Sequence, residues 1–319
     1  MLVRFWGTRG SLPTPLDAVA VRKKIVNAVM KASGRVFETE QDAARFVDED
    51  FSFAERATYG GESSCVEIEA GNDEFMICDM GSGLRRFGLD SFRRTAGGKP
   101  KTFNFFMSHF HWDHIMGFPF FGPAFDPGST INVFGGHDEM ETALRRQQEK
   151  ISFPVPFDFL NAKFTFTTLT PGESYDIAGC TVQLIDQFHD NDSYGYRFEC
   201  DGKSAVYSTD SEHKSEHAED DEAFVSFFRQ ADLVIFDTMY TLADAVTMKE
   251  DWGHSSNVAA VDLCHRAGAK RLAMYHHEPV NNDETMLGIH QETIRYEELM
   301  RQDSSLDVLC AYDGLEVVL

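Results

Sequence analysis

Residues 108–114, Ser-His-Phe-His-Trp-Asp-His, constrain what this chain can fold into more than any other segment. They hold three imidazoles and one carboxylate, and they directly follow the apolar run 103–107, which we expect to be a buried strand. The first two histidines are two residues apart in extended chain and point to one side, whereas the final Asp-His pair lies beyond a turn and can face a second point. Neutral imidazole and carboxylate suit Zn, Mn or Fe. The segment therefore predicts a metal site at the end of a strand.

Three later apolar runs end in the same kind of residue. Each run is short enough to be a strand, and each is followed within three residues by one that can bind a metal. A site for two metals needs ligands from several strand ends, so we expect these side chains to join the first cluster. They are His189 after 181–188, Asp210 after 204–207, and His276 and His277 after 272–275.

Helical patterns lie between the strand-like segments. Helices are predicted at 220–229, 255–267 and 283–302, and residues 15–58 read as an inserted helical hairpin. The hairpin is expected to be a lid, a dimer contact or simple surface decoration. Short strands with interspersed helices predict a sheet-on-sheet core covered by helices, in a single domain over residues 1–319 with the site at one rim.

The charge of the chain bears on its partners. With 29 basic and 52 acidic residues the formal net charge is −23. Such a surface repels polyphosphate, so long nucleic acid is a poor partner. Bound divalent ions would restore positive charge locally, which keeps a small anionic substrate possible.

Cysteine usage and hydropathy indicate a compartment. The six cysteines form no C-x-x-C pair, and we expect buried free thiols in a reducing environment. No segment approaches the length of a membrane span. The expected location is the cytoplasm, without membrane association.

The His-x-His-x-Asp-His run at 109–114 resembles the signature of the metallo-β-lactamase fold hydrolases, and the later strand-end residues match that pattern over nearly the whole chain. The resemblance implies an α+β fold, a four-layer αββα sandwich, with 15–58 as an insertion. His277 rivals His276, but Glu278-Pro279 resembles the family's stretch best with His276 as ligand. Asp79 is expected either to accept a hydrogen bond from a ligand imidazole or to be a turn residue. The ligands implied are His109, His111 and His189 for one metal, Asp113, His114 and His276 for the other, and Asp210 as the bridge.

Three other stretches resemble the phosphodiesterase branch of that fold, which holds ribonuclease Z and the small-molecule and cyclic-nucleotide phosphodiesterases. They are Val-Arg-Phe-Trp-Gly-Thr-Arg-Gly-Ser at 3–11, Phe-Asp-Thr at 236–238 and Gly-His-Ser-Ser at 253–256. Glu62 departs from the pattern, because relatives more often carry Asn there. That departure leaves the substrate contacts around the Gly60-Gly61 turn open.

The resemblance implies a dimetal phosphodiesterase in which a metal-activated hydroxide attacks phosphorus. Asp113 would orient the water, and His254 would protonate the departing alkoxide, with Asp237 orienting its ring and raising its pKa. The alternative for His254 is a residue preceding a helix cap at Ser255 or Ser256. Zinc is the first choice of metal, with manganese or iron as alternatives.

The expected substrate is small. Ribonuclease Z-like enzymes carry a long basic arm between the third His and the bridging Asp, whereas His189 and Asp210 are only 21 positions apart here. A cyclic nucleotide is the first candidate. The alternatives are hydrolysis of a lactone, β-lactam or isothiocyanate, and a non-catalytic sensor. A homodimer is possible.

Two groups of side chains have a plain structural explanation. The aromatic loop 118–125 could stack a nucleobase, but core or rim packing is favoured. Five histidines lie in polar segments and are expected to be solvated rather than part of the site: His137, His213, His217, His265 and His290.

Overall fold

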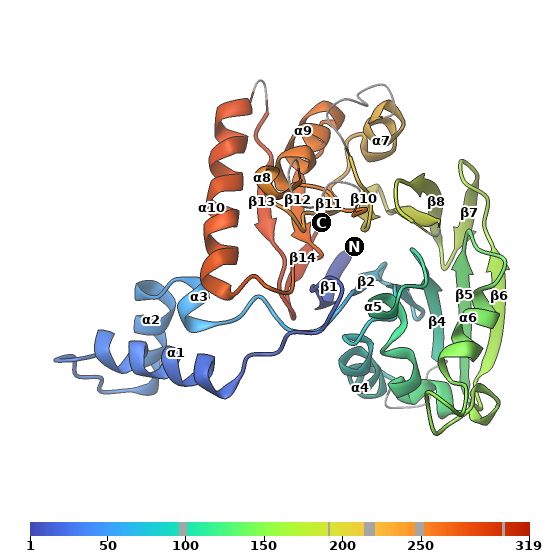
Figure 1. Ribbon diagram of the computed structural model, residues 1–319, viewed down its shortest axis with the longest axis horizontal. Coiled ribbons are helices and arrows are strands. Elements are labelled where there is room, and N and C mark those ends of the chain that lie inside the picture. Colours follow the sequence, from blue (N-terminus) through green and yellow to red (C-terminus); the bar gives the residue numbers. More distant parts are fainter. Residues whose placement is uncertain (96–100, 191, 214–220, 246–251, 302–303) are drawn as a thin grey trace.

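Two seven-stranded sheets face each other across the middle of this computed structural model (Figure 1). The structure describes residues 1–95, 101–190, 192–213, 221–245, 252–301 and 304–319. The first sheet has the order β14-β1-β2-β3-β4-β5-β6. Its strands are β1 (Leu2–Gly7), β2 (Cys65–Glu69), β3 (Phe75–Cys78), β4 (Lys101–Phe106), β5 (Ser129–Gly135), β6 (Lys163–Thr168) and β14 (Glu316–Val318).

The second sheet has the order β13-β12-β11-β10-β9-β8-β7. Strands β10 to β13 run parallel to one another, and β7, β8, β9 and β10 form antiparallel pairs. The strands are β7 (Ser174–Ile177), β8 (Cys180–Gln187), β9 (Ser193–Cys200), β10 (Lys203–Ser208), β11 (Leu233–Asp237), β12 (Arg271–Tyr275) and β13 (Asp307–Cys310).

Helices cover the outer face of each sheet. The first sheet is covered by α4 (Leu84–Arg94), α5 (Trp112–Ile115), α6 (Met140–Gln147) and the 3₁₀ turns η1 (Phe118–Phe120), η2 (Gly122–Phe125) and η3 (Phe157–Phe159). The second is covered by α7 (Asp221–Phe228), α9 (Asn257–Ala267) and α10 (Asp283–Met300), with the short α8 (Leu242–Ala245) nearby.

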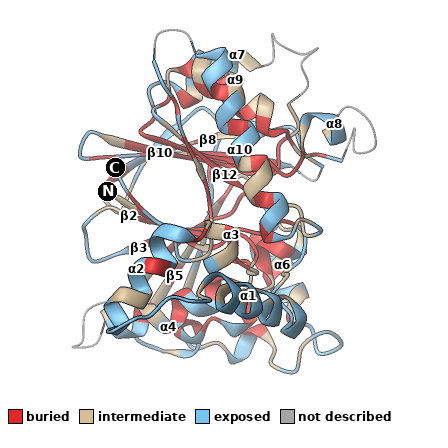
Figure 2. Cartoon of the chain, turned by 90° about the vertical axis from the view of Figure 1, so that its left-hand side faces the viewer, coloured by how far each residue is buried: buried red, intermediate tan, exposed pale blue. Residues whose placement is uncertain are grey.

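Three apolar clusters hold these four layers together. One lies between the sheets, where Phe5, Phe106 and Tyr207 are fully buried, and the other two join each sheet to its helices. Figure 2 shows the buried strands in the middle and exposed residues on the outer surfaces of the helices. The four-layer αββα sandwich is therefore confirmed.

The insertion predicted at 15–58 contains three helices, α1 (Ala18–Lys31), α2 (Glu40–Asp50) and α3 (Phe53–Arg56). Asp17 caps α1, and Thr39 caps α2 in a capping box with Asp42. α3 contacts both α1 and α10, and Figure 1 shows α1 and α2 projecting from the body of the molecule.

Strand direction explains why the site lies at one rim. β3 is parallel to β4, and β10, β11 and β12 are parallel to one another, so their carboxyl ends meet at common edges of the two sheets. The register aligns Ser208 with Phe236, and Asp237 with Tyr275. The residues that follow these strand ends are thereby brought close together.

The expectation about cysteines is wrong for one pair. Cys180 opens β8 and Cys200 closes β9, and the structure joins them in a disulfide with their Cα atoms 4.8 Å apart. The antiparallel register places them opposite each other, which sequence separation alone does not reveal. The other four, Cys65, Cys78, Cys264 and Cys310, are buried free thiols as expected. Among the helices that the structure describes, none has the length and apolar character needed to cross a membrane.

Candidate metal centre

Four donor atoms at the rim of the sheets lie at the spacing of a metal coordination shell. They are Asp113 Oδ2, His114 Nε2, Asp210 Oδ1 and His276 Nε2. Each of the five separations that the structure fixes among them is 3.2 or 3.3 Å. A tetrahedron with metal–ligand bonds of about 2.0 Å has edges of about 3.3 Å, so the donor atoms of this group have the spacing of ligands to a small divalent cation.

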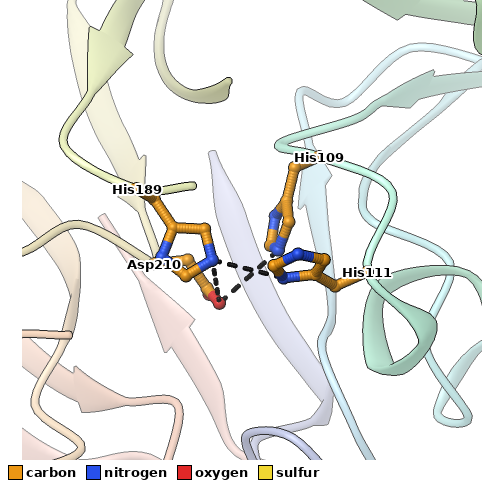
Figure 3. Close-up of side chains that lie close together, drawn as sticks. All are labelled: His109, His111, His189 and Asp210. Atoms are coloured by element: carbon orange, nitrogen blue, oxygen red, sulfur yellow. Dashed lines mark hydrogen bonds and ion pairs between the residues drawn. The ribbon is translucent and has the colours of Figure 1, made fainter. Parts of the chain in front are cut away.

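A second group shares Asp210 (Figure 3). His109, His111 and His189 converge on its other oxygen from two different sheets. Asp210 Oδ2 lies 3.6 Å from His109 Nε2 and 3.8 Å from His189 Nε2, and His189 Nε2 lies 3.2 Å from His111 Nδ1. Because Asp210 turns one oxygen to each group, its carboxylate stands where a ligand that bridges two cations would stand.

The backbone is unusual at these positions. Asp210 and His276 have φ angles of 51° and 57°, and Asp79, beside the site, has 60°. For a residue other than glycine the left-handed region costs on the order of 1–2 kcal/mol. Such conformations persist where the surroundings fix them, and each one here ends a strand and directs its side chain into the rim.

Electrostatics at the rim favour bound positive charge. His114 is fully buried, which lowers its pKa, but the carboxylates of Asp113, Asp210 and Asp79 outweigh that effect and raise the pKa well above its ordinary value. Burial also raises the pKa of the Asp210 carboxyl, yet His276, His114 and His109 hold it well below the usual range. A divalent cation at the ring nitrogens would supply the charge that a proton supplies otherwise.

The protonation and hydrogen bonding of His109 also fit a metal ligand. Burial lowers the pKa of His109 well below its ordinary value, and its buried Nε2 has no hydrogen-bond partner among the described residues. A neutral imidazole with an unpaired buried nitrogen fits a metal ligand. The donor set therefore fits two divalent cations.

A second layer of hydrogen bonds orients these rings. His114 Nδ1 donates to Asp79 Oδ2 over 2.7 Å, so Asp79 is an acceptor for a site imidazole as expected. The same carboxylate accepts from Ser108 and from Tyr207 OH, also at 2.7 Å. On the other side, His189 Nδ1 donates to Gly253 O over 2.8 Å. These bonds leave the Nε2 atoms of both rings directed at the site.

Gly253 must be a glycine for this arrangement. Its φ is +78°, and a Cβ there would lie 2.2 Å from His189 Nδ1. The carbonyl can approach the His189 ring only because no side chain intervenes.

His254 lies beside the two groups and is held by Asp237. Its Nδ1 donates to Asp237 Oδ2 over 2.8 Å and lies 4.0 Å from Asp210 Oδ2. Asp237 is fully buried, and its other oxygen accepts from the backbone N–H of Met239. Burial lowers the pKa of His254, but Asp237 foremost, then Asp210 and Asp113, raise it to about 9. The helix cap that the sequence offers as the alternative explanation of this stretch is the neighbouring Ser256, whose side chain caps α9.

His277 points away from the cluster. Its Nε2 donates to Ala311 O over 2.7 Å in the interior, and burial lowers its pKa to about 3. The structure thus brings His276, and not its neighbour, to the rim, together with the other six predicted ligands.

The expectation that five histidines are solvated is wrong for those that the structure describes. His137, His265 and His290 are half-buried, and the side chain of His213 is buried. The side chain of His213 is 2% exposed, and its Nδ1 donates to Asp221 Oδ1 over 3.0 Å. It packs on Phe224, so the residues that follow Asp210 turn inward against α7. His217 lies outside the described residues.

Several supporting residues were not predicted. Ser11 donates its backbone N–H to Asp113 Oδ2 over 2.8 Å, and a Cβ on Gly10 would lie 2.6 Å from the His276 ring. Arg9 is buried and donates to the carbonyls of Gly60, Glu278 and Asn281. The stretch 3–11 is a recognisable motif in the sequence, but the roles of its residues depend on contacts far along the chain. Glu62, the departure from the family pattern, accepts from Ser82 Oγ at 2.5 Å.

Comparison with known proteins agrees with this geometry. Residues 99–277 match a family model described as a beta-lactamase superfamily domain. Ribonuclease Z of Thermoplasma acidophilum is 24% identical over 249 residues, which cover 63% of this chain and 78% of the relative. The crystal structure of the metallo-beta-lactamase fold protein YhfI from Bacillus subtilis superimposes with a TM-score of 0.64 at 16% identity, covering 99% of this chain and 98% of the other. A diphosphatase from the PhnP family gives 0.61 at 18% identity, covering 100% and 97%.

Proposed function

The chain belongs to the beta-lactamase superfamily, and from this premise we propose that it is a dimetal phosphodiesterase acting on a small phosphodiester, with a cyclic nucleotide as its first candidate. The broader statement is that the chain is a metal-dependent hydrolase acting on phosphodiesters, as its ribonuclease Z relatives support. The narrower proposal depends on the residues at the rim.

The observation that carries it is the position of His254. Cleaving a phosphodiester leaves an alkoxide that must gain a proton, which a positioned acid supplies. His254 is protonated at neutral pH, because its pKa is raised to about 9, and its Nδ1 lies 4.0 Å from the carboxylate shared by the two ligand groups. Asp237 fixes the ring through Nδ1, so Nε2 is the atom that donates.

The ligand residues suit zinc first, and manganese or iron as alternatives, since they offer only nitrogen and oxygen at near-tetrahedral spacing. Two divalent cations held there would lower the pKa of a water molecule and neutralise charge on the phosphoryl oxygens. Asp113 would orient the attacking water. Its carboxylate is fixed by the Ser11 N–H, and its pKa is held well below the usual range by His114 and His276 against the effect of burial.

Charge and topology support a small substrate. Between His189 and Asp210 the described residues form β9, β10 and short connections, with no inserted arm. The net charge of −23 opposes the many phosphate contacts that a long RNA needs. RNA cleavage, the activity that the relatives' name indicates, is the alternative outcome of the test.

The test is a substrate panel on protein reconstituted with zinc or manganese. We expect turnover of cyclic AMP and of bis(p-nitrophenyl) phosphate, and no cleavage of a precursor tRNA. Cleavage of the precursor tRNA without turnover of cyclic AMP would overturn the small-substrate proposal. Turnover confined to a lactone, a β-lactam or an isothiocyanate would overturn the phosphodiesterase proposal. A protein that binds two metals but turns over none of these would indicate a sensor.

We also propose that α1 is a contact between two copies of the chain. Its outer face is apolar and exposed, whereas its inner face carries Ala20, Lys24 and Ala28 toward the body. An amphipathic helix normally packs its apolar face on the core and exposes its polar face. The exposed side chains are Val19, Val21, Ile25, Val26, Val29 and Met30.

The charges beside that face argue for a protein partner rather than a phosphate surface. Lys23 pairs with Glu284, Lys24 with Asp283, and Lys31 with Glu55, so these lysines are engaged within the chain. Burying the apolar side chains of two such faces would contribute on the order of 10 kcal/mol before the cost of association. The occupant proposed for this face is therefore a second copy of the chain, with one α1 packed against the other.

A further inference from the structure

A cavity of about 870 Å³ opens beside the metal centre, between α5 and α6. His111, one of the cluster histidines, forms part of its wall, so a molecule bound at the rim can extend into it. A volume of this size is typical of sites for small ligands. The mechanism described above makes no use of this space.

Two helical faces line the cavity. From α6 and its cap come residues 139, 142, 143 and 146, which recur at helical spacing on one side of that helix. From α5, its cap and the following turn η1 come Trp112, Ile115, Met116 and Phe120. Phe110 and Phe153 complete an aromatic lining.

Two of these aromatic side chains are unusually exposed. Trp112 is 81% and Phe120 is 59% exposed, whereas Phe118 and Phe121 of the same loop are fully buried in the core. Core packing thus explains the buried pair and leaves the exposed pair unexplained. Phe153 contacts the edge of Phe120, with ring centroids 5.5 Å apart, which fixes the orientation of that ring. A rigid, exposed ring beside a reaction centre is a platform on which a planar group can stack.

Polar side chains also belong to the wall of the cavity. Gln147 and His137 are each anchored through Nε2, to Ile115 O over 2.9 Å and to Asp192 O over 2.6 Å. Polar side chains that are held in place suit a planar heterocycle, whose edge carries donors and acceptors, better than an alkyl chain.

Arg146 supplies a cation in the same wall. It forms no ion pair with any residue that the structure describes, although the chain carries an excess of 23 negative charges. The adjacent Arg145 is instead engaged by Glu141 and Asp158. A guanidinium that is not engaged in an ion pair can stack on the face of a base.

From these observations we infer that the cavity is the binding site for the nucleobase of a nucleoside phosphodiester, stacked on Trp112 and Phe120 with its polar edge toward Gln147 and His137. This inference rests on the proposed function and deepens it, because it assigns the part of the chain that holds the base. It also gives the exposed side chains of Trp112 and Phe120 a role, which core packing does not.

Binding of two probes of equal charge, AMP and ribose 5-phosphate, tests the inference by calorimetry on the metal-loaded protein. They differ only in the base, so we expect AMP to bind at least tenfold more tightly. Phe120→Ala and Arg146→Ala should each weaken AMP binding about tenfold and leave the affinity for ribose 5-phosphate unchanged. The same variants should raise KM for cyclic AMP and leave kcat within about twofold.

Matched controls separate the cavity from the surface. Arg145→Ala lies on the same helix as Arg146, and Phe159→Ala removes another exposed phenylalanine that does not line the cavity. Both controls should bind AMP like the unmodified protein. Equal affinity for AMP and ribose 5-phosphate, or unchanged AMP binding in Phe120→Ala and Arg146→Ala, would overturn the inference. If AMP binds as expected but no phosphodiester is cleaved, the cavity assignment stands and the proposed reaction falls.

Discussion

Asp237 Oδ2 accepts a hydrogen bond from His254 Nδ1 over 2.8 Å, although the two residues lie in different elements, at the end of β11 and before α9. Both side chains sit at the rim where two groups of donor atoms share Asp210. The bond determines which nitrogen of His254 is free to donate and makes the ring a cation at neutral pH. We therefore expect this pair to determine both proton donation to the leaving group and its dependence on pH.

Replacing His254 should abolish proton donation without disturbing the fold. We expect His254→Ala to lower kcat on cyclic AMP by about 10²- to 10⁴-fold, because general acid catalysis has that magnitude. On bis(p-nitrophenyl) phosphate, whose leaving group needs little protonation, the loss should be much smaller. Circular dichroism and metal content should match the unmodified protein. Equal losses on both substrates would contradict the role of acid.

His254 should also determine how the activity depends on pH. The pKa of His254 is raised to about 9, so the donating form is present at neutral pH and is lost as pH rises through 9. Activity should therefore fall on the alkaline side near that value. Asp237→Asn removes the carboxylate charge that raises this pKa, and should move the alkaline limb down by about one to two pH units. The kcat–pH profiles of the two proteins check this, and an unmoved limb would assign it to another group.

Much of the site could be predicted from the sequence because its ligands follow strand ends. Apolar runs ending in His or Asp predict His109, Asp210 and His276 as ligands. The parallel direction of β10, β11 and β12 brings Asp210 and His276 to one rim, and His109 follows β4 of the facing sheet. Local sequence patterns do not predict contacts between distant segments, such as those of Ser11 with Asp113 and of Gly253 with His189.

The helix α4 shows a different reason for failure. It was not predicted, because its buried face includes Gly88 and Ser91 beside Leu84 and Phe87, and small or polar residues hide the apolar period. Gly88 is small because Phe121 packs there, 3.0 Å from where a Cβ would lie. In α1 the apolar periodicity is present but lies on the exposed side of the helix, so it predicts the helix and not the face that packs on the core.

Removing the metals should destabilise the protein. Without cations the rim holds the carboxylates of Asp79, Asp113 and Asp210 close together and buried. Ligands that bind only the folded state stabilise it by about 4 kcal/mol at 1,000 times Kd, so chelation should lower Tm by roughly 5–10 °C. Calorimetry before and after dialysis against EDTA, followed by zinc addition, measures this. An unchanged Tm with zinc content falling from two ions to none would contradict the proposed centre.

A charge on the outer face of α1 should separate the two copies. Val29 is 65% exposed, so Val29→Asp costs little folding stability but places a carboxylate at the proposed contact. We expect light scattering after gel filtration to show a dimer for the unmodified protein and a monomer for the variant. Leu299→Asp, at an equally exposed position on α10, is the control and should remain dimeric. A monomeric unmodified protein would remove the proposed contact.

Gly253 offers a test of one ligand through its neighbour. In Gly253→Ala the new Cβ would lie 2.2 Å from His189 Nδ1, so the ring must move and lose its bond to Gly253 O. Because loss of such an orienting bond costs about 10- to 100-fold in metal affinity, we expect the variant to retain one metal under conditions where the unmodified protein holds two. Gly172→Ala is the matched control: its φ of +83° imposes the same backbone strain, but nothing lies within 4 Å of the added carbon. Mass spectrometry of metal content in the two variants separates loss of the His189 orientation, expected only in Gly253→Ala, from strain, which would affect both alike.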